Sequence, residues 1–262
     1  MGESASLRAK DYRTLFQVVG ECRELGADPI AWRLHLLKAI CAELGARVGA
    51  GGEATGIAQG KFIPLSTVDD GWENDDQRQA MFDWLELQAK GGAPKGLLPL
   101  KEPTTVHAIL NRGEYYTDQQ PDCLDELADY LRRSEVQDLL LSMHRIAIGP
   151  DHFCGLTIMR GLGDREFSSR DKMFLATLHR EIAPLVGRQL AKANEPSTMR
   201  LSPRRRQVLD CLLEGMSEKQ AATELGLTQP TVHQYVKAVY RHFHVYSRAE
   251  LMARWVRFAR GA

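Results

Sequence analysis

The chain has 262 residues, of which 44% are hydrophobic, 26% charged and 7% aromatic. This composition excludes collagen-like and intrinsically disordered chains, and the length suggests one large domain or two ordinary ones. The formal net charge is zero, but the charges are segregated, since 11 Lys and Arg stand against 5 Asp and Glu from residue 197 onward. A basic C-terminal part on an acidic body is typical of nucleic-acid-binding proteins.

Two classes of protein are disfavoured at the start. No apolar run approaches the roughly 20 residues that cross a bilayer, and the first residues lack the basic and apolar regions of a secretory signal. We therefore expect a cytoplasmic protein with no membrane contact. The five cysteines are scattered, without the spacing of zinc or redox motifs, so neither a disulfide framework nor a metal site nor another cofactor is expected.

The chain opens with two predicted amphipathic helices. The first covers residues 11–25, and the second runs from an Asp28 cap and Pro29 to Val48. The glycine-rich residues 49–60 are expected to form loop and turn. The elements expected next are one strand and two helices, within residues 61–68, 74–90 and 121–133.

The hydrophobic period then changes. Residues 137–148 and 152–160 are apolar runs separated by Gly149-Pro150-Asp151, which predicts a β-hairpin. A long helix is predicted from Ser168 toward a linker at residues 194–200, with Pro184 bending it or shifting its boundary.

The order of these elements loosely resembles GAF and PAS sensor domains. We therefore expect residues 1–193 to form an α+β sensor-like domain. A phosphoacceptor receiver is rejected, because the acidic pair Asp69-Asp70 comes too late, after a glycine-rich loop.

Sensors of this kind bind small ligands between the sheet and its covering helices. Five aromatic residues are candidates for lining such a pocket, although each is more often plain core: Trp72, Trp84, Tyr115, Tyr116 and Phe153. The rival interpretation is an enzyme, because His144, His152 and Cys154 lie on or beside the predicted hairpin. No nucleophile elbow, phosphate loop or paired metal motif accompanies them, so no catalytic residue is predicted.

Residues 201–262 predict an all-α domain of four helices. Ser202 and Pro203 start the first helix, Ser217 caps the second, and Thr228 caps a third that runs to about Phe243. A short helix, a turn with glycine and a longer helix follow in the order of a helix-turn-helix.

The third of these helices has two different faces. Its apolar face consists of Val232, Val236, Val239 and Phe243. Its polar face consists of His233, Gln234, Lys237 and Arg241. Side chains that donate to base edges and phosphates stand together there, near the helix start, where a recognition helix meets the major groove.

These residues resemble the LuxR-type (GerE-type) helix-turn-helix family of bacterial transcription regulators. The matching positions keep the family spacing without a gap: Leu201, Ser202, Arg204, Val208, Leu209, Ser217, Lys219, Ala222, Thr228, Thr231, Val232, Val245 and Arg248. The chain departs from the pattern at Arg205, where the family usually has Glu, at His233, where it has Lys, and at Tyr235, where it has His. A preferred DNA sequence is therefore not transferable from the family.

The resemblance implies roles for individual residues. The family's base-contacting positions fall on His233, Gln234 and Lys237. Its phosphate-contacting positions fall on Lys219, Thr228, Thr231 and Arg248, and Arg241 joins them from the polar helix face. Duplex DNA is therefore the expected partner. The alternative is an interaction protein similar to sigma-factor region four, whose partner is RNA polymerase.

A homodimer is expected, because one recognition helix reads only a few base pairs and two-fold pairing doubles the site. The closing helix offers Leu251, Met252 and Trp255 as dimer contacts. A small-molecule signal at the front domain is expected to change DNA affinity through the helix from Ser168, which is predicted to end only a few residues before Leu201.

Overall fold

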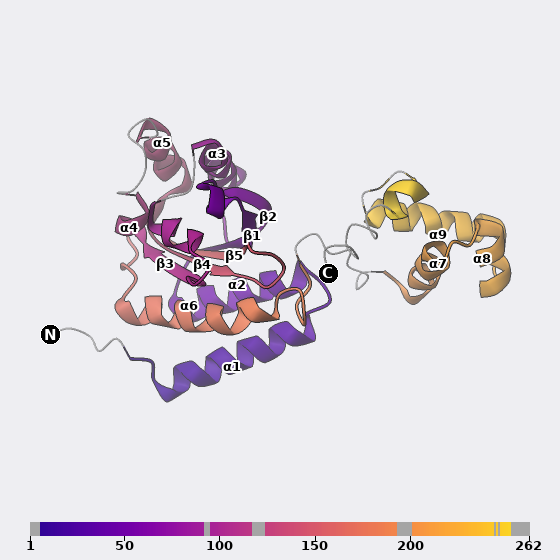
Figure 1. The fold of residues 1–262 in the computed structure, drawn as a ribbon, viewed down its shortest axis with the longest axis horizontal. Helices are drawn as coiled ribbons and strands as arrows, with labels where there is room; N and C mark the ends of the chain where they lie inside the picture. The colour runs from indigo at the N-terminus through magenta and orange to yellow at the C-terminus, as the bar shows by residue number, and fades with distance from the viewer. Residues whose placement is uncertain are drawn as a thin grey trace. The chain divides into compact units, whose positions relative to one another are not determined.

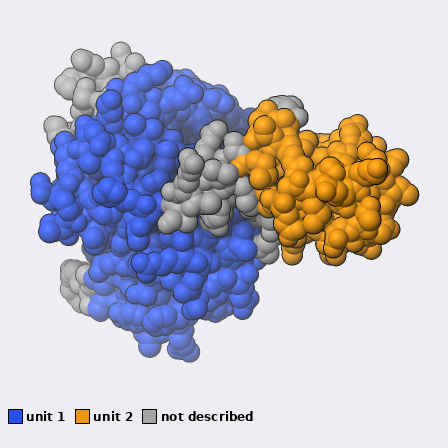
Figure 2. Space-filling view, turned by 45° about the vertical axis from the view of Figure 1, so that its right-hand side comes forward, with its two compact units in different colours: residues 1–193 blue, residues 194–262 orange. Residues whose placement is uncertain are grey.

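The structure, a computed structural model, describes residues 6–91, 95–116, 124–192, 201–243, 245 and 247–252. The chain forms two compact units, Met1–Ala193 and Asn194–Ala262 (Figure 2). The first unit is α+β and the second is all-α, which confirms both predicted fold classes. No helix within the described ranges is both long and apolar enough to cross a membrane.

A five-stranded antiparallel sheet lies at the centre of the first unit, in the order β2-β1-β5-β4-β3 (Figure 1). The strands are β1 (Val48–Thr55), β2 (Ile63–Asp70), β3 (His107–Asn111), β4 (Val136–Arg145) and β5 (His152–Gly161). The predicted hairpin is confirmed, since β4 and β5 pair from Arg145 opposite Phe153 to Val136 opposite Gly161. The strand expected near residues 61–68 is β2. The short β3 was not predicted.

Strand β1 corrects two expectations. The second helix, α2 (Ala31–Leu44), ends at Gly45 in the left-handed conformation, so Val48 opens a strand instead of closing a helix. Most of the glycine-rich segment is also strand. Glycine stands at several of its positions because neighbouring atoms leave little room for a side chain. A Cβ added to Gly49 would lie 3.2 Å from the Leu37 Cβ, and one added to Gly52 would lie 1.9 Å from the Ser66 carbonyl oxygen. Glycine here marks close packing rather than a turn.

Helices cover both faces of the sheet (Figure 1). On one face, α2 and α6 (Ser169–Ile182) pack on the strands, and α1 (Ala9–Glu24) lies outside them; their shared core includes Trp32, Leu36 and Phe174. On the other face, α3 (Asp75–Gly91), a 3-10 helix (Lys95–Lys101) and α5 (Leu124–Ser134) close over a second core that includes Trp84 and Phe153. A short α4 (Arg112–Tyr116) follows β3.

The helix from Ser168 begins as predicted and ends earlier. The Ser168 hydroxyl caps it by accepting from the Asp171 N–H. The helix stops at Ile182, one residue before the 3-10 turn Ala183–Leu185 that contains Pro184. The chain then folds back, and the Ala191 N–H donates to the Gly26 carbonyl oxygen at 2.7 Å. The prediction that this helix runs to within a few residues of Leu201 is therefore wrong.

The second unit contains α7 (Pro203–Leu213), α8 (Glu218–Leu225) and α9 (Gln229–His242), and residues 248–252 are again helical. Ser202, Ser217 and Thr228 cap the three helices with their hydroxyl groups, as predicted. One apolar core, which includes Val208, Ala221 and Val236, holds these helices together.

Candidate nucleic-acid interface and ligand pocket

The turn between α8 and α9 is specified by local chemistry. Ser217 and Gln220 form a reciprocal capping box at the start of α8. Gly226 ends α8 in the left-handed conformation, with φ of 63°. Two residues later Thr228 caps α9. These capping groups, all within the second unit, orient the two helices of the helix-turn-helix.

The two predicted faces of α9 are confirmed by burial. Val232, Val236 and Val239 are at most 3% exposed. The side chains of His233, Gln234, Lys237 and Arg241 are all exposed. The helix therefore presents donor-bearing side chains to solvent while its other side completes the core. Their assignment to individual bases remains a prediction.

The residues predicted to contact phosphates divide into two groups. Lys219 is exposed on the first turn of α8, and the hydroxyls of Thr228 and Thr231 lie 2.8 Å apart at the start of α9. Arg248 instead points into the unit, and its guanidinium donates to the carbonyl oxygens of Leu212 and Met216, each at 2.7 Å. Arg248 thus links the last described helical segment to the end of α7 and to the turn that follows α7. The sequence did not indicate this structural role.

The predicted dimer contacts at the chain end need one correction. Leu251 is 0% exposed and belongs to the core of its own unit, so it is not available to a second protomer. An apolar pattern on the closing helix did not show which of its residues face the core of their own unit. Met252 is half-buried, and Trp255 lies outside the described residues.

One contact on the exposed face links α8 to α9. The Nδ1 atom of His233 lies 3.2 and 3.1 Å from the two carboxylate oxygens of Glu218. The His233 side chain is 48% exposed and the Glu218 side chain 30%. A residue predicted to read bases is therefore held by a carboxylate on the neighbouring helix.

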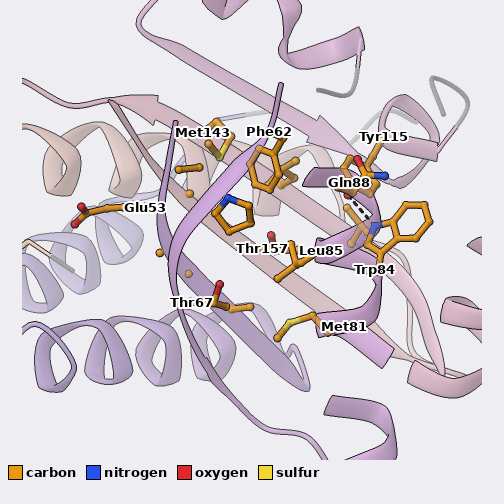
Figure 3. A pocket seen from close by; sticks show the side chains of 18 of the residues that line it. Glu53, Phe62, Thr67, Met81, Trp84, Leu85, Gln88, Tyr115, Met143 and Thr157 are labelled. Atoms are coloured by element: carbon orange, nitrogen blue, oxygen red, sulfur yellow. Dashed lines mark hydrogen bonds between the residues drawn. The ribbon is translucent and has the colours of Figure 1, made fainter. Parts of the chain in front are cut away.

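The first unit contains a cavity of about 90 Å³ between the sheet and α3 (Figure 3). Small residues of two central strands form one wall: Ala50, Gly52, Ala54 and Gly155. Aromatic and aliphatic side chains form the opposite wall: Phe62, Met81, Trp84, Leu85, Tyr115 and Tyr130. The lack of side-chain bulk on β1 thus leaves the space that the other wall encloses.

Trp84 and Tyr115 line this cavity, as two of the five candidate aromatics were expected to do. The Trp84 Nε1–H donates to the Tyr115 hydroxyl at 3.0 Å, and the Trp84 ring stacks on Tyr130 with centroids 5.5 Å apart. Burial raises the pKa of Tyr115 to about 12, so the phenol stays neutral. Of the other candidates, Phe153 is 0% exposed and belongs to the core.

The last two candidates are not seen in the cavity wall. Trp72 packs against the second core without lining the cavity, and the side chain of Tyr116 lies outside the described residues. The glycines and alanines of β1, which the sequence interpretation missed, also line the cavity.

Behind the small-residue wall lies a buried ion pair. Glu53 belongs to β1, and in Figure 3 its side chain is directed away from the labelled side chains around the cavity. Its carboxylate accepts from the Arg33 guanidinium of α2 at 2.5 Å, and both side chains are 3% exposed. Arg33 also donates to the carbonyl oxygen of Ala191 at 3.2 Å. The cavity wall is therefore connected to the chain just before the segment that leads to the second unit.

The residues considered for catalysis do not form a nucleophilic site in the described parts of the chain. His144 stands opposite Cys154 in the register of β4 and β5, but its Nδ1–H donates to the Arg145 carbonyl oxygen. Burial raises the pKa of the Cys154 thiol to about 12, so the thiolate is not available at neutral pH. His152 lies 3.6 Å from the Glu53 carboxylate. Across the described residues, no group of three or more His, Cys, Asp or Glu is arranged to hold a metal ion.

Comparison with known proteins places the family resemblance in the second unit. Residues 199–255 match the model of the family "Bacterial regulatory proteins, luxR family". The two-component response regulator PprB of Pseudomonas aeruginosa is 38% identical over 69 residues, which cover 26% of this chain and 25% of PprB. The probable HTH-type transcriptional regulator GfsR of Streptomyces halstedii is 32% identical over 59 residues, which cover 22% of this chain and 24% of GfsR. The match therefore spans about a quarter of each relative.

Solved structures of SdiA are similar over nearly the whole chain, at low identity. The crystal structure of Escherichia coli SdiA is 12% identical with a TM-score of 0.42, covering 93% of this chain and 95% of SdiA. SdiA in complex with octanoyl-rac-glycerol is 11% identical with a TM-score of 0.47, covering 95% and 96%. The helix-turn-helix geometry and the family match agree on the second unit: residues 199–255 of this chain are a helix-turn-helix domain of the LuxR family of bacterial regulatory proteins.

Proposed function

We propose that this chain is a cytoplasmic, sequence-specific DNA-binding transcription regulator, and that it is not an enzyme. The observation that carries the proposal is the exposed polar face of α9, set on an apolar core within a LuxR-family domain. In such domains the recognition helix enters the major groove, and neighbouring basic and hydroxyl side chains hold the phosphates. Lys219 and Arg241 are exposed and suited to the second task.

Salt dependence and base competition test this proposal. The logarithm of the binding constant of the full chain for duplex DNA should fall with the logarithm of salt concentration, by about 0.9 per neutralised phosphate. Gln234→Ala or Lys237→Ala should relax choice at one or two base pairs, whereas Lys219→Ala should weaken all sequences alike. Binding to RNA polymerase core enzyme with no affinity for duplex DNA would contradict the proposal and favour the sigma-like alternative.

We also propose that the regulator binds an inverted repeat in DNA as a homodimer. A single α9 spans only a few base pairs, and an isologous pair doubles the recognised sequence. Half-site centres should lie about one helical turn apart. A nuclease footprint on a selected operator measures this spacing, and protection of a single asymmetric half-site would argue for a monomer.

The first unit, in our proposal, is a sensor that takes a small, uncharged and largely apolar molecule into its cavity. The walls are apolar and aromatic, and the polar neighbours other than Glu53, such as Thr67, Thr157 and Gln88, carry neutral hydroxyl or amide groups. The one carboxylate among the lining residues, Glu53, is paired with Arg33 on the far side of the strand. A charged ligand would therefore be desolvated without a partner.

A small neutral aromatic molecule, benzene, tests the cavity directly. Saturable binding, followed by ligand-observed NMR, is expected with the full chain, and Ala50→Leu, which fills the small-residue wall, should remove it. Gly20→Ala is the control, because the added methyl group has no neighbour within 4 Å. Equal binding by Ala50→Leu and the unsubstituted chain would contradict the assignment.

The route from cavity to DNA differs from the one expected from sequence. Helix α6 ends at Ile182, 19 residues before Leu201 in the sequence. The Ala191 carbonyl oxygen is instead held by Arg33 and by the Trp32 Nε1–H at 3.0 Å. A ligand that displaces β1 moves Glu53 and with it this anchor. Coupling of about 1–3 kcal/mol would change operator affinity about 5- to 150-fold.

A further inference from the structure

The contact between His233 and Glu218 restricts which ring nitrogen of His233 is available to DNA. A carboxylate has acceptors only, so the nitrogen that faces it must carry a hydrogen. In the structure both carboxylate oxygens of Glu218 face Nδ1. The hydrogen therefore resides on Nδ1, and Nε2, which makes no hydrogen bond to the described residues, is left to accept one when the ring is neutral.

We propose that Glu218 is a positioning residue that orients His233 so that Nε2 accepts a hydrogen bond from the amino group of a base. The major-groove edges that offer such a donor are adenine N6 and cytosine N4, whereas guanine offers acceptors. Glu218 thereby determines the choice of base without touching DNA. This inference rests on the proposed function, because it assumes that the exposed face of α9 meets the major groove.

Two features of the site support a positioning role for Glu218. It stands at the first position of α8, whose capping box and packed alanines hold that helix against α9. It also joins the two helices of the turn, so the ring of His233 is restrained from outside its own helix. The neighbouring candidates Gln234 and Lys237 can donate to bases, so an acceptor at His233 adds a different specificity.

The first test examines the free protein. With histidine ring nitrogens labelled, nitrogen NMR of the full chain at pH 8 should show His233 with its hydrogen on Nδ1; His233→Gln identifies the signal. Glu218→Ala should shift the ring toward the Nε2–H form, and Glu218→Gln, which retains an acceptor oxygen, should restore it. Glu224→Ala, which removes a charge elsewhere on α8, should change nothing. An Nε2–H form in the unsubstituted chain would overturn the positioning role.

The second test examines base choice. Selection from random duplexes at pH 8 should give adenine or cytosine at the position that His233→Ala relaxes, with about tenfold discrimination or more. Glu218→Ala should abolish discrimination there and leave other positions intact, and Glu224→Ala should leave all positions intact. A guanine preference at that position, or uniform weakening by Glu218→Ala, would overturn the proposal. Absence of any selected sequence would reject the proposed function, while the NMR result would still decide the role of Glu218.

Discussion

The two units of this chain place their polar groups in opposite ways. Among the described residues, every buried polar or charged side chain belongs to the first unit, including Arg33, Glu53 and His179. Among the described residues of the second unit the fully buried side chains are apolar, and the polar side chains are exposed or half-buried, on α7, α8, α9 and the helical segment from Arg248. The first unit thus holds charged and titratable groups in its interior, whereas the described core of the second unit is apolar.

The largest expected effect is a loss of stability in the first unit when the buried ion pair is broken. Arg33→Met removes the guanidinium that pairs with the buried Glu53 carboxylate and should lower the free energy of unfolding by about 3–5 kcal/mol. Combining it with Glu53→Leu should recover most of the loss. Arg132→Met is the control, because its pair with Asp129 is exposed and is worth at most about 1 kcal/mol. Urea unfolding followed by tryptophan fluorescence measures all three, and a full loss in the double variant would contradict the account.

A pH effect confined to the first unit is expected next. Burial, followed by the charges of His144 and Arg180, lowers the pKa of His107 to about 4. The unfolded chain therefore binds protons first as the pH falls, so stability is complete above about pH 6.5 and is lost progressively toward pH 4. For His107 the loss is about 3 kcal/mol.

Burial also lowers the pKa of the neighbours His144 and His179, whose rings lie 5.5 and 5.9 Å from His107 between centroids. Urea unfolding between pH 7.5 and 4.5 measures the combined slope. His107→Gln should flatten it by the share of one histidine. An identical slope in this variant would show that His107 takes up its proton while the unit is folded.

Arg248 distinguishes structure from DNA contact in the second unit. Arg248→Ala removes the charged hydrogen bonds to the Leu212 and Met216 carbonyl oxygens and should destabilise the unit by about 1.5–3 kcal/mol. Lys219→Ala should leave stability unchanged and weaken DNA binding. Thermal unfolding followed by circular dichroism, beside DNA titration, separates the two. If Arg248→Ala lowers DNA affinity at full stability, Arg248 acts through phosphates as the family resemblance implied.

The smallest expected effect concerns a helix cap. Ser217→Ala removes the hydroxyl that accepts from the Gln220 N–H and should cost about 1 kcal/mol. Ser217→Gly should cost only a few tenths of that amount. Thermal unfolding measures both, and equal losses would show that the hydroxyl, which both variants lack, decides the stability of α8 and that glycine does not compensate for it.

The same contrast explains which predictions from sequence succeeded. The caps at Ser217 and Thr228 and the two faces of α9 follow from residues a few positions apart, so the sequence alone predicts them. In the first unit, the helix α1 and the β4–β5 hairpin were predictable for the same reason. Strand β1 was not, because its glycines are required by Leu37 and Ser66, residues distant in the chain.

The functional residues that were missed also depend on distant partners. Arg33 gains its role only because Glu53 and Ala191 meet it in the fold. Leu251 was placed at a dimer surface because an apolar helix pattern does not distinguish a core from an interface. His233 was predicted to contact bases, and its contact with Glu218 arises only because α8 packs on α9.

We expect the exposed face of α9 to read the base sequence of duplex DNA. Selection from a random duplex library with the full chain, beside a chain carrying His233→Ala, Gln234→Ala and Lys237→Ala, measures this. The unsubstituted chain should enrich an inverted repeat and the triple variant should enrich none, at equal stability of both proteins. Enrichment of the same sequence by the triple variant, or no enrichment by either protein, would show that this face does not read DNA.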